Sequence, residues 1–365
     1  MCPKMEDRAY NFAAGPAQMP ESVLKKAQAE LLNWHGCGMS VMEMSHRGSQ
    51  FKEIYLEARE RLKHLLGVPE THEVLFLQGG ATTQFAAIPL NLMGKLGASY
   101  AVTGNFSGIA AKEAEKYVPV SIAWDGTEEG FTRIPRQEEL NIEPNSAYFH
   151  YCANNTIFGT AWDYVPETGG VPLVCDMSSE IMSRPVDVAR YALIYAGAQK
   201  NMAPAGVTVV IVDRFYAGHE RPETPQIMSY QKEINKESML NTPPCWCIYM
   251  LGLVLEWVEA EGGIKVMDER RRERSRLIYD VLDNSRLYKA HAAADSRSCM
   301  NVTFRTGSEE LDAEFVKGAA ERGLLNVKGH RLTGGMRASL YNAMPIEGAR
   351  ALAQYMKDFE VAHHV

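Results

Sequence analysis

Short apolar segments alternate with longer amphipathic segments through the first two thirds of the chain, and this alternation restricts the possible folds more than any other feature. The apolar segments are rich in β-branched and aromatic residues, as strands covered on both faces should be, and helical connections between such strands make a parallel sheet. The candidate strands are Glu73–Leu77, Tyr100–Thr103, Val118–Trp124, Ala147–Cys152, Pro172–Cys175, Leu193–Ala196 and Val207–Val212. We therefore predict an α/β domain with a mostly parallel seven-stranded sheet.

The pattern changes after about Glu261, which predicts a smaller α+β domain. The expected elements are a long charged helix, a strand near Met300–Phe304, a helix near Glu309–Arg322, a strand near Met336–Leu340 and a helix from Ile346. With 365 residues the chain is long for a single core. We predict a large domain over residues 16–259 and a small domain formed by residues 1–15 and 260–365. The basic run Arg270–Arg274 is interpreted as a solvated helix face.

Charge and composition exclude several classes of protein. The net charge is −7 with Lys and Arg spread along the chain, whereas nucleic acids and anionic membranes bind concentrated basic patches. The start of the chain, MCPKMEDRAY, has no apolar signal segment, and the apolar run Cys245–Leu255 is too short to cross a bilayer. Seven irregularly spaced cysteines fit neither a disulfide framework nor a zinc site. We expect a cytoplasmic protein with small-molecule or protein partners.

The first of three candidate strand-end sites follows Val74–Leu77, where the sequence Gln78-Gly79-Gly80-Ala81-Thr82-Thr83-Gln84 leads into a helix. Ligands of α/β sheets bind at the carboxyl ends of the strands. Small residues and hydroxyls at a helix N-terminus favour phosphate binding, although an ordinary strand-to-helix turn has a similar sequence. Neither the Walker pattern nor the dinucleotide glycine pattern is present, which disfavours a nucleotide.

The other two strand ends carry an aspartate and a lysine. Asp176 follows Leu173–Cys175, and it either begins an ordinary turn or pairs with a buried cation such as a protonated pyridine nitrogen. Lys200 follows Leu193–Ala196 among small residues, where desolvation would lower its pKa and make it a nucleophile and base. A lysine, an aspartate and an anion site are together the groups that pyridoxal phosphate requires.

Several motifs resemble the phosphoserine aminotransferase family, a branch of the class V aminotransferases. The lysine motif is Ala196-Gly197-Ala198-Gln199-Lys200, with Gly206 six residues later. The others are Asn11-Phe12 with Gly15-Pro16, Met42-Glu43-Met44-Ser45-His46-Arg47, Gln84-Phe85, Asp176 with Ser178-Ser179, Ser183-Arg184-Pro185, Asn241-Thr242-Pro243-Pro244, Lys328-Gly329-His330-Arg331 and Gly335-Met336-Arg337-Ala338-Ser339. The resemblance extends from about residue 10 to the final helix.

The resemblance implies a fold-type I enzyme dependent on pyridoxal 5'-phosphate, working as a homodimer with active sites at the subunit interface. It implies that Lys200 holds the cofactor covalently and that Asp176 is the partner of the pyridine nitrogen. The other cofactor contacts that it implies are Ala81, Thr82, Phe106, Thr156 and Gln199, with Asn241 and Thr242 from the neighbouring subunit. It implies no metal.

The implied reaction is a reversible transamination between L-glutamate and 3-phosphohydroxypyruvate in serine biosynthesis, and 4-phosphohydroxythreonine stays open as a further substrate. By the same resemblance, Arg337 pairs with the substrate α-carboxylate, and the distal anionic group lies among His46, Arg47, His330 and Arg331. A guanidinium binds a carboxylate or phosphate through two parallel hydrogen bonds, which suits substrates with two anionic ends.

Three positions depart from the usual family pattern, and one of them is Asn155, which replaces a frequent glutamate. Phe106 stands where relatives often have a tryptophan that stacks on the cofactor, and Ala81-Thr82-Thr83 replaces a Gly-Arg-Gly sequence. The alternatives are another class V aminotransferase, a desulfurase, or a binding protein without activity. A desulfurase needs a mobile, exposed cysteine, which no sequence feature indicates. A protein that had lost its activity would be expected to lack Lys200 or Asp176, and both are present.

Overall fold

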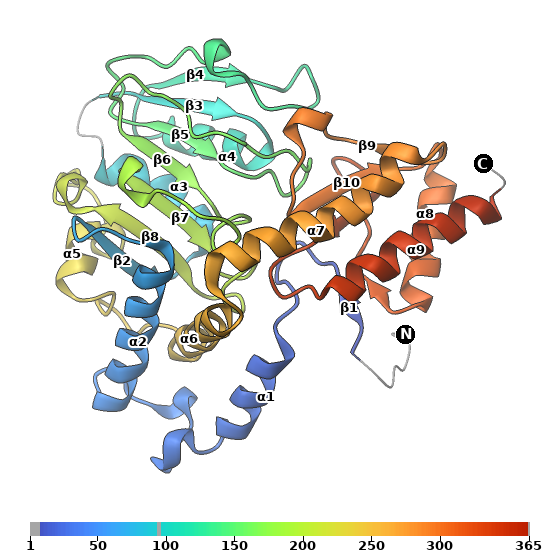
Figure 1. Ribbon diagram of the computed structural model, residues 1–365. Coiled ribbons are helices and arrows are strands. Elements are labelled where there is room, and N and C mark those ends of the chain that lie inside the picture. Colours follow the sequence, from blue (N-terminus) through green and yellow to red (C-terminus); the bar gives the residue numbers. More distant parts are fainter. Residues whose placement is uncertain (1–7, 93–95, 364–365) are drawn as a thin grey trace.

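The computed structural model describes residues 8–92 and 96–363, and its central element is a seven-stranded sheet (Figure 1). The strands are β2 (His72–Leu77), β3 (Ala98–Val102), β4 (Val120–Asp125), β5 (Phe149–Cys152), β6 (Leu173–Asp176), β7 (Leu193–Gly197) and β8 (Thr208–Asp213). Their order is β2-β8-β7-β6-β5-β3-β4, and β8 alone runs in the direction opposite to the other six strands. The predicted mostly parallel sheet is confirmed.

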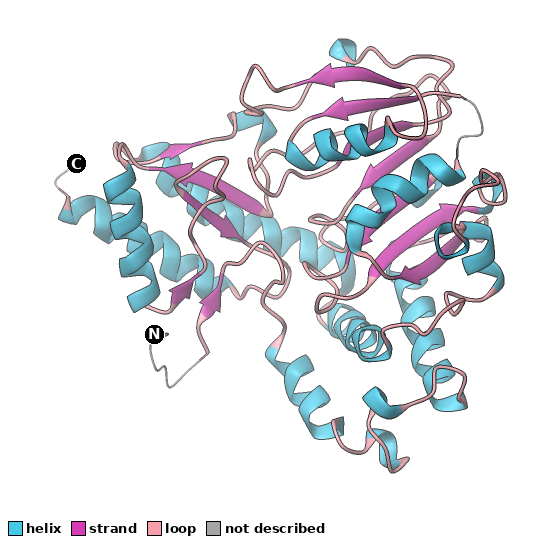
Figure 2. Ribbon diagram, turned by 180° about the vertical axis from the view of Figure 1, so that it is seen from behind, coloured by secondary structure: helices cyan, strands magenta, loops and turns pink. Residues whose placement is uncertain are grey.

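Helices cover both faces of this sheet, as Figures 1 and 2 show from opposite sides. The helices are α1 (Glu21–Glu30), α2 (Ser49–Leu66), α3 (Gly80–Asn91), α4 (Asn105–Ala114), α5 (Tyr230–Asn235) and α6 (Cys245–Ala260). Successive side chains of a strand point to opposite faces. Accordingly, Ile194 packs in one core with α2 and α6, while Leu193 and Tyr195 pack in the other with α3 and α4. This burial on both faces explains the continuous apolar runs.

The C-terminal part forms a second body with its own core (Figure 2). Its elements are β9 (Lys289–Ala290), β10 (Asn301–Arg305), β11 (Leu324–Leu325), β12 (Met336–Ser339), α7 (Gly263–Asn284), α8 (Glu309–Glu321) and α9 (Ile346–Ala362). β9, β10 and β12 make an antiparallel sheet. The N-terminal strand β1 (Tyr10–Asn11) pairs with β11, and Phe12 joins the second core. The exact domain boundaries stay a prediction.

Helix α7 bridges the two bodies. Ile264 and Met267 lie in the core below the large sheet, whereas Ile278 and Leu282 lie in the C-terminal core. The predicted solvated face on this helix is correct for Arg272, which is exposed, but wrong for Arg271 and Arg274, which are only 6% and 2% exposed. The reason is that α7 packs against both α6 and α9. Residues three or four positions apart lie on the same side of a helix, so charged residues on the packed side are buried together with the apolar ones.

The described residues contain neither a membrane-spanning helix nor a cluster of metal-binding side chains. None of the helices in residues 8–92 and 96–363 is long and apolar enough to cross a membrane. Within the same ranges there is no cluster of three or more His, Cys, Asp and Glu side chains that could hold a metal ion. Most of the segment MCPKMEDRAY and part of the predicted small domain, residues 1–7, lie outside the described residues.

Candidate active site

A cavity of about 290 Å³ lies at the carboxyl ends of β5, β6 and β7 and contains most of the predicted site residues. The arrowheads of β3 and β4 point to the same side, towards the C-terminal body (Figure 1). The predicted residues on its wall are Ala81, Thr82, Phe106, Thr156, Asp176, Gln199, Lys200, His330 and Arg337. Residues from all three candidate strand-end sites, including Ala81, Asp176 and Lys200, therefore line one cavity.

Lys200 and Asp176 lie in this cavity with shifted pKa values. Burial lowers the pKa of the Lys200 amine, although the carboxylate of Asp176 acts in the opposite direction. The Nζ atom of Lys200 donates a hydrogen bond of 2.7 Å to Oγ1 of Thr156. Burial raises the pKa of Asp176, which accepts a hydrogen bond of 2.8 Å from the backbone N–H of Ser178. A neutral amine is thus more populated at Lys200 than at an exposed lysine.

The first turn of α3 forms another wall. Gly79 precedes it in the left-handed conformation, with φ of +92°, and no side chain caps the helix. The first backbone N–H groups of a helix have no partner inside the helix and carry a partial positive charge. The wall residues Ala81 and Thr82 belong to this turn, so it fits a phosphate group.

The N-terminal segment closes the cavity beside Lys200. Gly15 has φ of +133°, and a Cβ atom added there would lie 3.3 Å from Cγ of Lys200. The backbone N–H of Ala17 donates to the carbonyl oxygen of Gln199 at 2.9 Å. Glycine is required at this turn by both the backbone angle and the close approach.

Arg337 on β12 contributes a second cation beside Thr156. Its Nη1 atom donates to the carbonyl oxygen of Thr156 at 3.2 Å, while its Nε atom is buried without a partner. Burial lowers its pKa. His330 lies on the same wall, and burial together with the charges of Arg337 and Arg331 lowers its pKa. This end of the cavity therefore offers unused donors for an anion.

A buried polar chain behind Asp176 was missed by sequence reasoning. Asp176, Tyr195 and His150 lie on the neighbouring strands β6, β7 and β5. Asp176 is paired with Tyr195, and His150 is paired with the residue two positions before Asp176, so all three side chains point to one face of the sheet. The Tyr195 hydroxyl lowers the pKa of Asp176 by hydrogen bonding, and it lies 2.9 Å from Nε2 of His150. Burial lowers the pKa of His150 to about 3, so the imidazole is neutral.

The direction of this chain follows from the second nitrogen of His150. Nδ1 has no hydrogen-bond partner, and an unpaired buried N–H group is rarer than an unpaired acceptor. The proton is therefore assigned to Nε2, which donates to the Tyr195 oxygen. The Tyr195 hydroxyl is then free to donate to Asp176. The signal in the sequence was a residue with a hydrogen-bonding side chain, His150, Asp176 or Tyr195, in each of three mostly apolar strands.

Five predicted residues do not line this cavity: His46, Arg47, Asn241, Thr242 and Arg331. His46 and Arg47 lie in the loop before α2. The Gln78 side chain holds the 241–242 loop, because its Oε1 accepts from Nδ2 of Asn241 and its Nε2 donates to the carbonyl oxygen of Thr242, both at 3.0 Å. Sequence reasoning missed this role of Gln78.

Comparison with known proteins identifies the family. The sequence profile described as Aminotransferase class-V matches residues 9–352. This chain belongs to the class V aminotransferases.

The relatives of this aminotransferase include proteins similar over the whole chain. It is 49% identical to the phosphoserine aminotransferase of Pseudomonas fluorescens, covering 98% of this chain and 100% of the relative. A phosphoserine aminotransferase from Bacillus circulans subsp. alkalophilus superposes with a TM-score of 0.95 at 44% identity, covering 98% and 99% of the two chains. A pyridoxal-phosphate-bound phosphoserine aminotransferase from Trichomonas vaginalis has a TM-score of 0.92 at 38% identity, covering 96% and 100%.

The groups in the cavity of this aminotransferase fit pyridoxal phosphate. The Lys200 amine suits the aldehyde carbon, the Asp176 carboxylate suits a protonated ring nitrogen, and the uncapped start of α3 suits the phosphate. Burial disfavours an unpaired carboxylate. A cation opposite Asp176 would therefore offset the free-energy cost of removing this carboxylate from water.

We expect Tyr195→Phe to weaken cofactor binding by this aminotransferase about tenfold, because a hydrogen bond to a charged group contributes about 1.5–3 kcal/mol. The pKa of Asp176 should rise further, since the Tyr195 hydroxyl lowers it. Equilibrium dialysis of pyridoxal phosphate over a pH series measures both effects.

Tyr100→Phe is the matched control for this prediction. It removes another fully buried hydroxyl, which bonds to Tyr148 at 2.6 Å. The control should retain wild-type cofactor affinity. Equal affinity losses in the two variants would show that the effect is general destabilisation of the sheet, and would contradict the assigned role of Tyr195.

Proposed function

We propose that the protein catalyses the reversible transamination between L-glutamate and 3-phosphohydroxypyruvate, giving O-phospho-L-serine and 2-oxoglutarate in serine biosynthesis, with pyridoxal phosphate as cofactor. The observation that carries this proposal is a single cavity containing Lys200, Asp176 and the uncapped start of α3. The 49% identity to a phosphoserine aminotransferase over 98% of the chain supports the substrate.

Residues of the large sheet and its helices hold the cofactor in this proposal. Lys200 binds it covalently, Asp176 pairs with the ring nitrogen, and the N–H groups of Ala81 and Thr82 bind the phosphate. Additional contacts come from Phe106, Thr156 and Gln199. When bound, the cofactor supplies an electron sink that stabilises negative charge at the substrate Cα atom. Asp176 contributes by keeping the ring nitrogen protonated.

Lys200 then acts as the proton carrier. When free, the neutral Nζ atom would accept the proton from the substrate Cα and deliver it to the cofactor carbon, and the reverse half-reaction would move the proton the other way. Its lowered pKa supports this role, because a base works best when its pKa lies near the working pH. Thr156 keeps Nζ oriented through the 2.7 Å hydrogen bond.

Arg337 binds the substrate α-carboxylate, and a basic group receives the distal phosphate or carboxylate. The group consists of His330, Arg331, His46 and Arg47. Only His330 of these four lines the cavity of its own chain. This supports a homodimer in which His46, Arg47, Asn241 and Thr242 complete the site of the neighbouring subunit. We further propose that the enzyme works in the cytoplasm.

We expect Arg337→Lys to lower kcat/KM for glutamate about 10–100-fold, because lysine cannot make the second parallel bond to a carboxylate and one such charged hydrogen bond contributes about 1.5–3 kcal/mol. Steady-state kinetics at fixed 3-phosphohydroxypyruvate measures the change, which should appear chiefly in KM. Arg276→Lys on the exposed surface of α7 is the control. Unchanged glutamate kinetics in Arg337→Lys would remove Arg337 from the substrate site.

The substrate itself is tested with a panel of 2-oxo acids. The purified enzyme, loaded with pyridoxal phosphate, receives glutamate and one of 3-phosphohydroxypyruvate, glyoxylate or oxaloacetate, and the product is identified by mass spectrometry. We expect the highest kcat/KM with the phosphorylated acid. A higher value with glyoxylate or oxaloacetate would keep an aminotransferase and reject the proposed substrate.

A further inference from the structure

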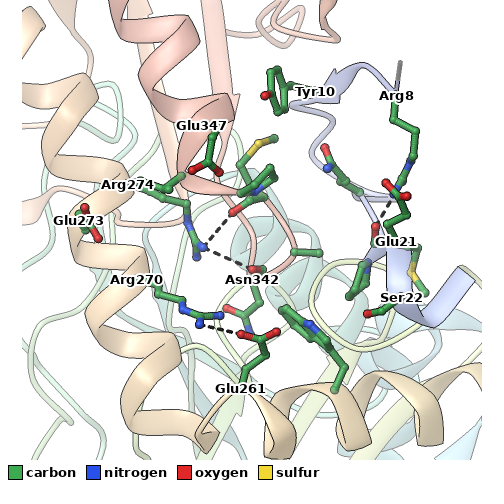
Figure 3. A pocket seen from close by; sticks show the side chains of 18 residues that line it. Arg8, Tyr10, Glu21, Ser22, Glu261, Arg270, Glu273, Arg274, Asn342 and Glu347 are labelled. Atoms are coloured by element: carbon green, nitrogen blue, oxygen red, sulfur yellow. Dashed lines mark hydrogen bonds and ion pairs between the residues drawn. The ribbon is translucent and has the colours of Figure 1, made fainter. Parts of the chain in front are cut away.

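We propose that the protein has a second ligand site, in a cavity separate from the one that contains Lys200. This site binds a small molecule through a carboxylate or phosphate group. This cavity has a volume of about 700 Å³ and lies between the starts of α1 and α9 and one face of α7 (Figure 3). It shares no lining residue with the cavity that contains Lys200. The site is additional to the proposed transamination.

The central residue is Arg274, which extends from α7 towards the middle of the cavity (Figure 3). Its side chain is 2% exposed. Nη1 donates to the backbone carbonyl oxygens of Asn342 and Met344, at 3.3 and 3.0 Å, but Nε and Nη2 have no acceptor. A buried donor without an acceptor is destabilising, and more so in a charged group. Burial lowers the pKa of Arg274 only to about 10, so the guanidinium keeps its charge at neutral pH.

The carboxylates around the cavity make no ion pair with Arg274, and the charge of Glu273 offsets only part of the effect of burial on the pKa of Arg274. Glu21 pairs with Lys25 at 2.6 Å, Glu261 pairs with Arg270 at 2.7 Å, and Glu273 and Glu347 pair with Arg350 at 3.7 and 3.9 Å. Among the ion pairs of the described residues, none includes Arg274. The guanidinium is therefore a buried cation that lacks an anion, and an oxyanion entering the cavity would supply one.

Two helix starts add to the positive field. The 17-residue helix α9 begins beside Pro345 and the 10-residue helix α1 beside Pro20, and neither has a side-chain cap. Both first turns line the cavity. Their N–H groups favour a negative charge, although Glu21 and Glu347 in the same two first turns offset part of this field.

The remaining wall indicates a ligand with an organic body as well as its anionic group. Tyr10, Met19, Trp257 and Met344 line the cavity, and its volume falls within the range of about 300–1,000 Å³ that is typical of small-molecule sites. A bare ion would leave most of this space to water. The ligand class is thus a small organic acid or a phosphorylated metabolite.

The test is isothermal titration calorimetry of the full-length protein loaded with pyridoxal phosphate, with inorganic phosphate and succinate as separate probes. Ser22→Asp places a like charge on the exposed first turn of α1, where an acidic residue is compatible with the helix. We expect this substitution to weaken anion binding at the proposed site about tenfold or more by charge repulsion, and to leave any other anion site unchanged. Asn145→Asp adds the same charge at an exposed position outside the cavity and should have no effect.

Arg274→Met removes the guanidinium and should abolish anion binding at the proposed site, with its folding checked by circular dichroism. Preferential binding of phosphate would identify a phosphorylated ligand, and preferential binding of succinate a carboxylic acid. The proposal would be overturned if the wild-type protein, Ser22→Asp and Asn145→Asp gave identical titrations. Every bound anion would then lie outside this cavity. The Ser22→Asp comparison decides the question even if Arg274→Met does not fold.

Discussion

Lys200→Ala is expected to lose catalysis almost completely, with kcat reduced by at least about 10³-fold, because the variant loses both the covalent attachment of the cofactor and a general base that alone contributes about 10²–10⁴-fold. The protein should still fold, since burial of the amine disfavours its charged form and the replacement removes that cost. Turnover of glutamate with 3-phosphohydroxypyruvate measures the loss, and thermal denaturation verifies the fold.

Lys112→Ala is a suitable control, because Lys112 is an exposed lysine on α4. It should retain full activity and full absorbance from bound cofactor. If Lys200→Ala turned over substrate at a rate comparable with this control, Lys200 would not be the catalytic lysine. The assignment of the cavity would then fail with it.

The second large effect is expected for Asp176→Asn, with kcat reduced about 10²–10³-fold, the range found when one charge-stabilising group is removed from an active site. The amide is nearly isosteric, but it cannot balance a positive charge on the ring nitrogen. Cofactor affinity should fall as well. Both quantities can be measured on one preparation, by turnover and by equilibrium dialysis of pyridoxal phosphate.

Asp176→Glu separates charge from geometry. It keeps the carboxylate but lengthens the side chain in a position that is only 6% exposed, so we expect partial activity between those of the wild-type and the asparagine variants. Wild-type kcat and cofactor affinity in Asp176→Asn would contradict the pairing of Asp176 with the ring nitrogen.

Much of the sheet and its ligand edge could be predicted, because both depend on local signals. Each of the seven strands begins and ends within two residues of its predicted bounds. Since β6 and β7 are adjacent and parallel, their last residues meet at one edge, which is why Asp176 and Lys200 could be placed in one site from sequence. The strands β1, β9 and β11 were not predicted, because two residues contain no periodicity.

The missed features depend on contacts between distant segments. Gln78 and Asn241 are 163 residues apart, and His150 and Tyr195 are 45 apart, so neither pair has a local pattern. Two arginines of the basic run on α7, Arg271 and Arg274, were misinterpreted for the same reason. The charges of this run predicted exposure, but Arg274 is covered by the segment at Asn342–Met344, which follows the strand β12.

The central claim, that this cavity performs transamination of glutamate and 3-phosphohydroxypyruvate, is tested most directly by the visible absorbance spectrum of the purified protein loaded with pyridoxal phosphate. The spectrum is recorded alone, after glutamate, and after subsequent 3-phosphohydroxypyruvate. We predict a yellow band that disappears with the amino acid and returns with the phosphorylated oxo acid. A protein that remains colourless when pyridoxal phosphate is supplied, or a band that neither compound changes, would contradict the account.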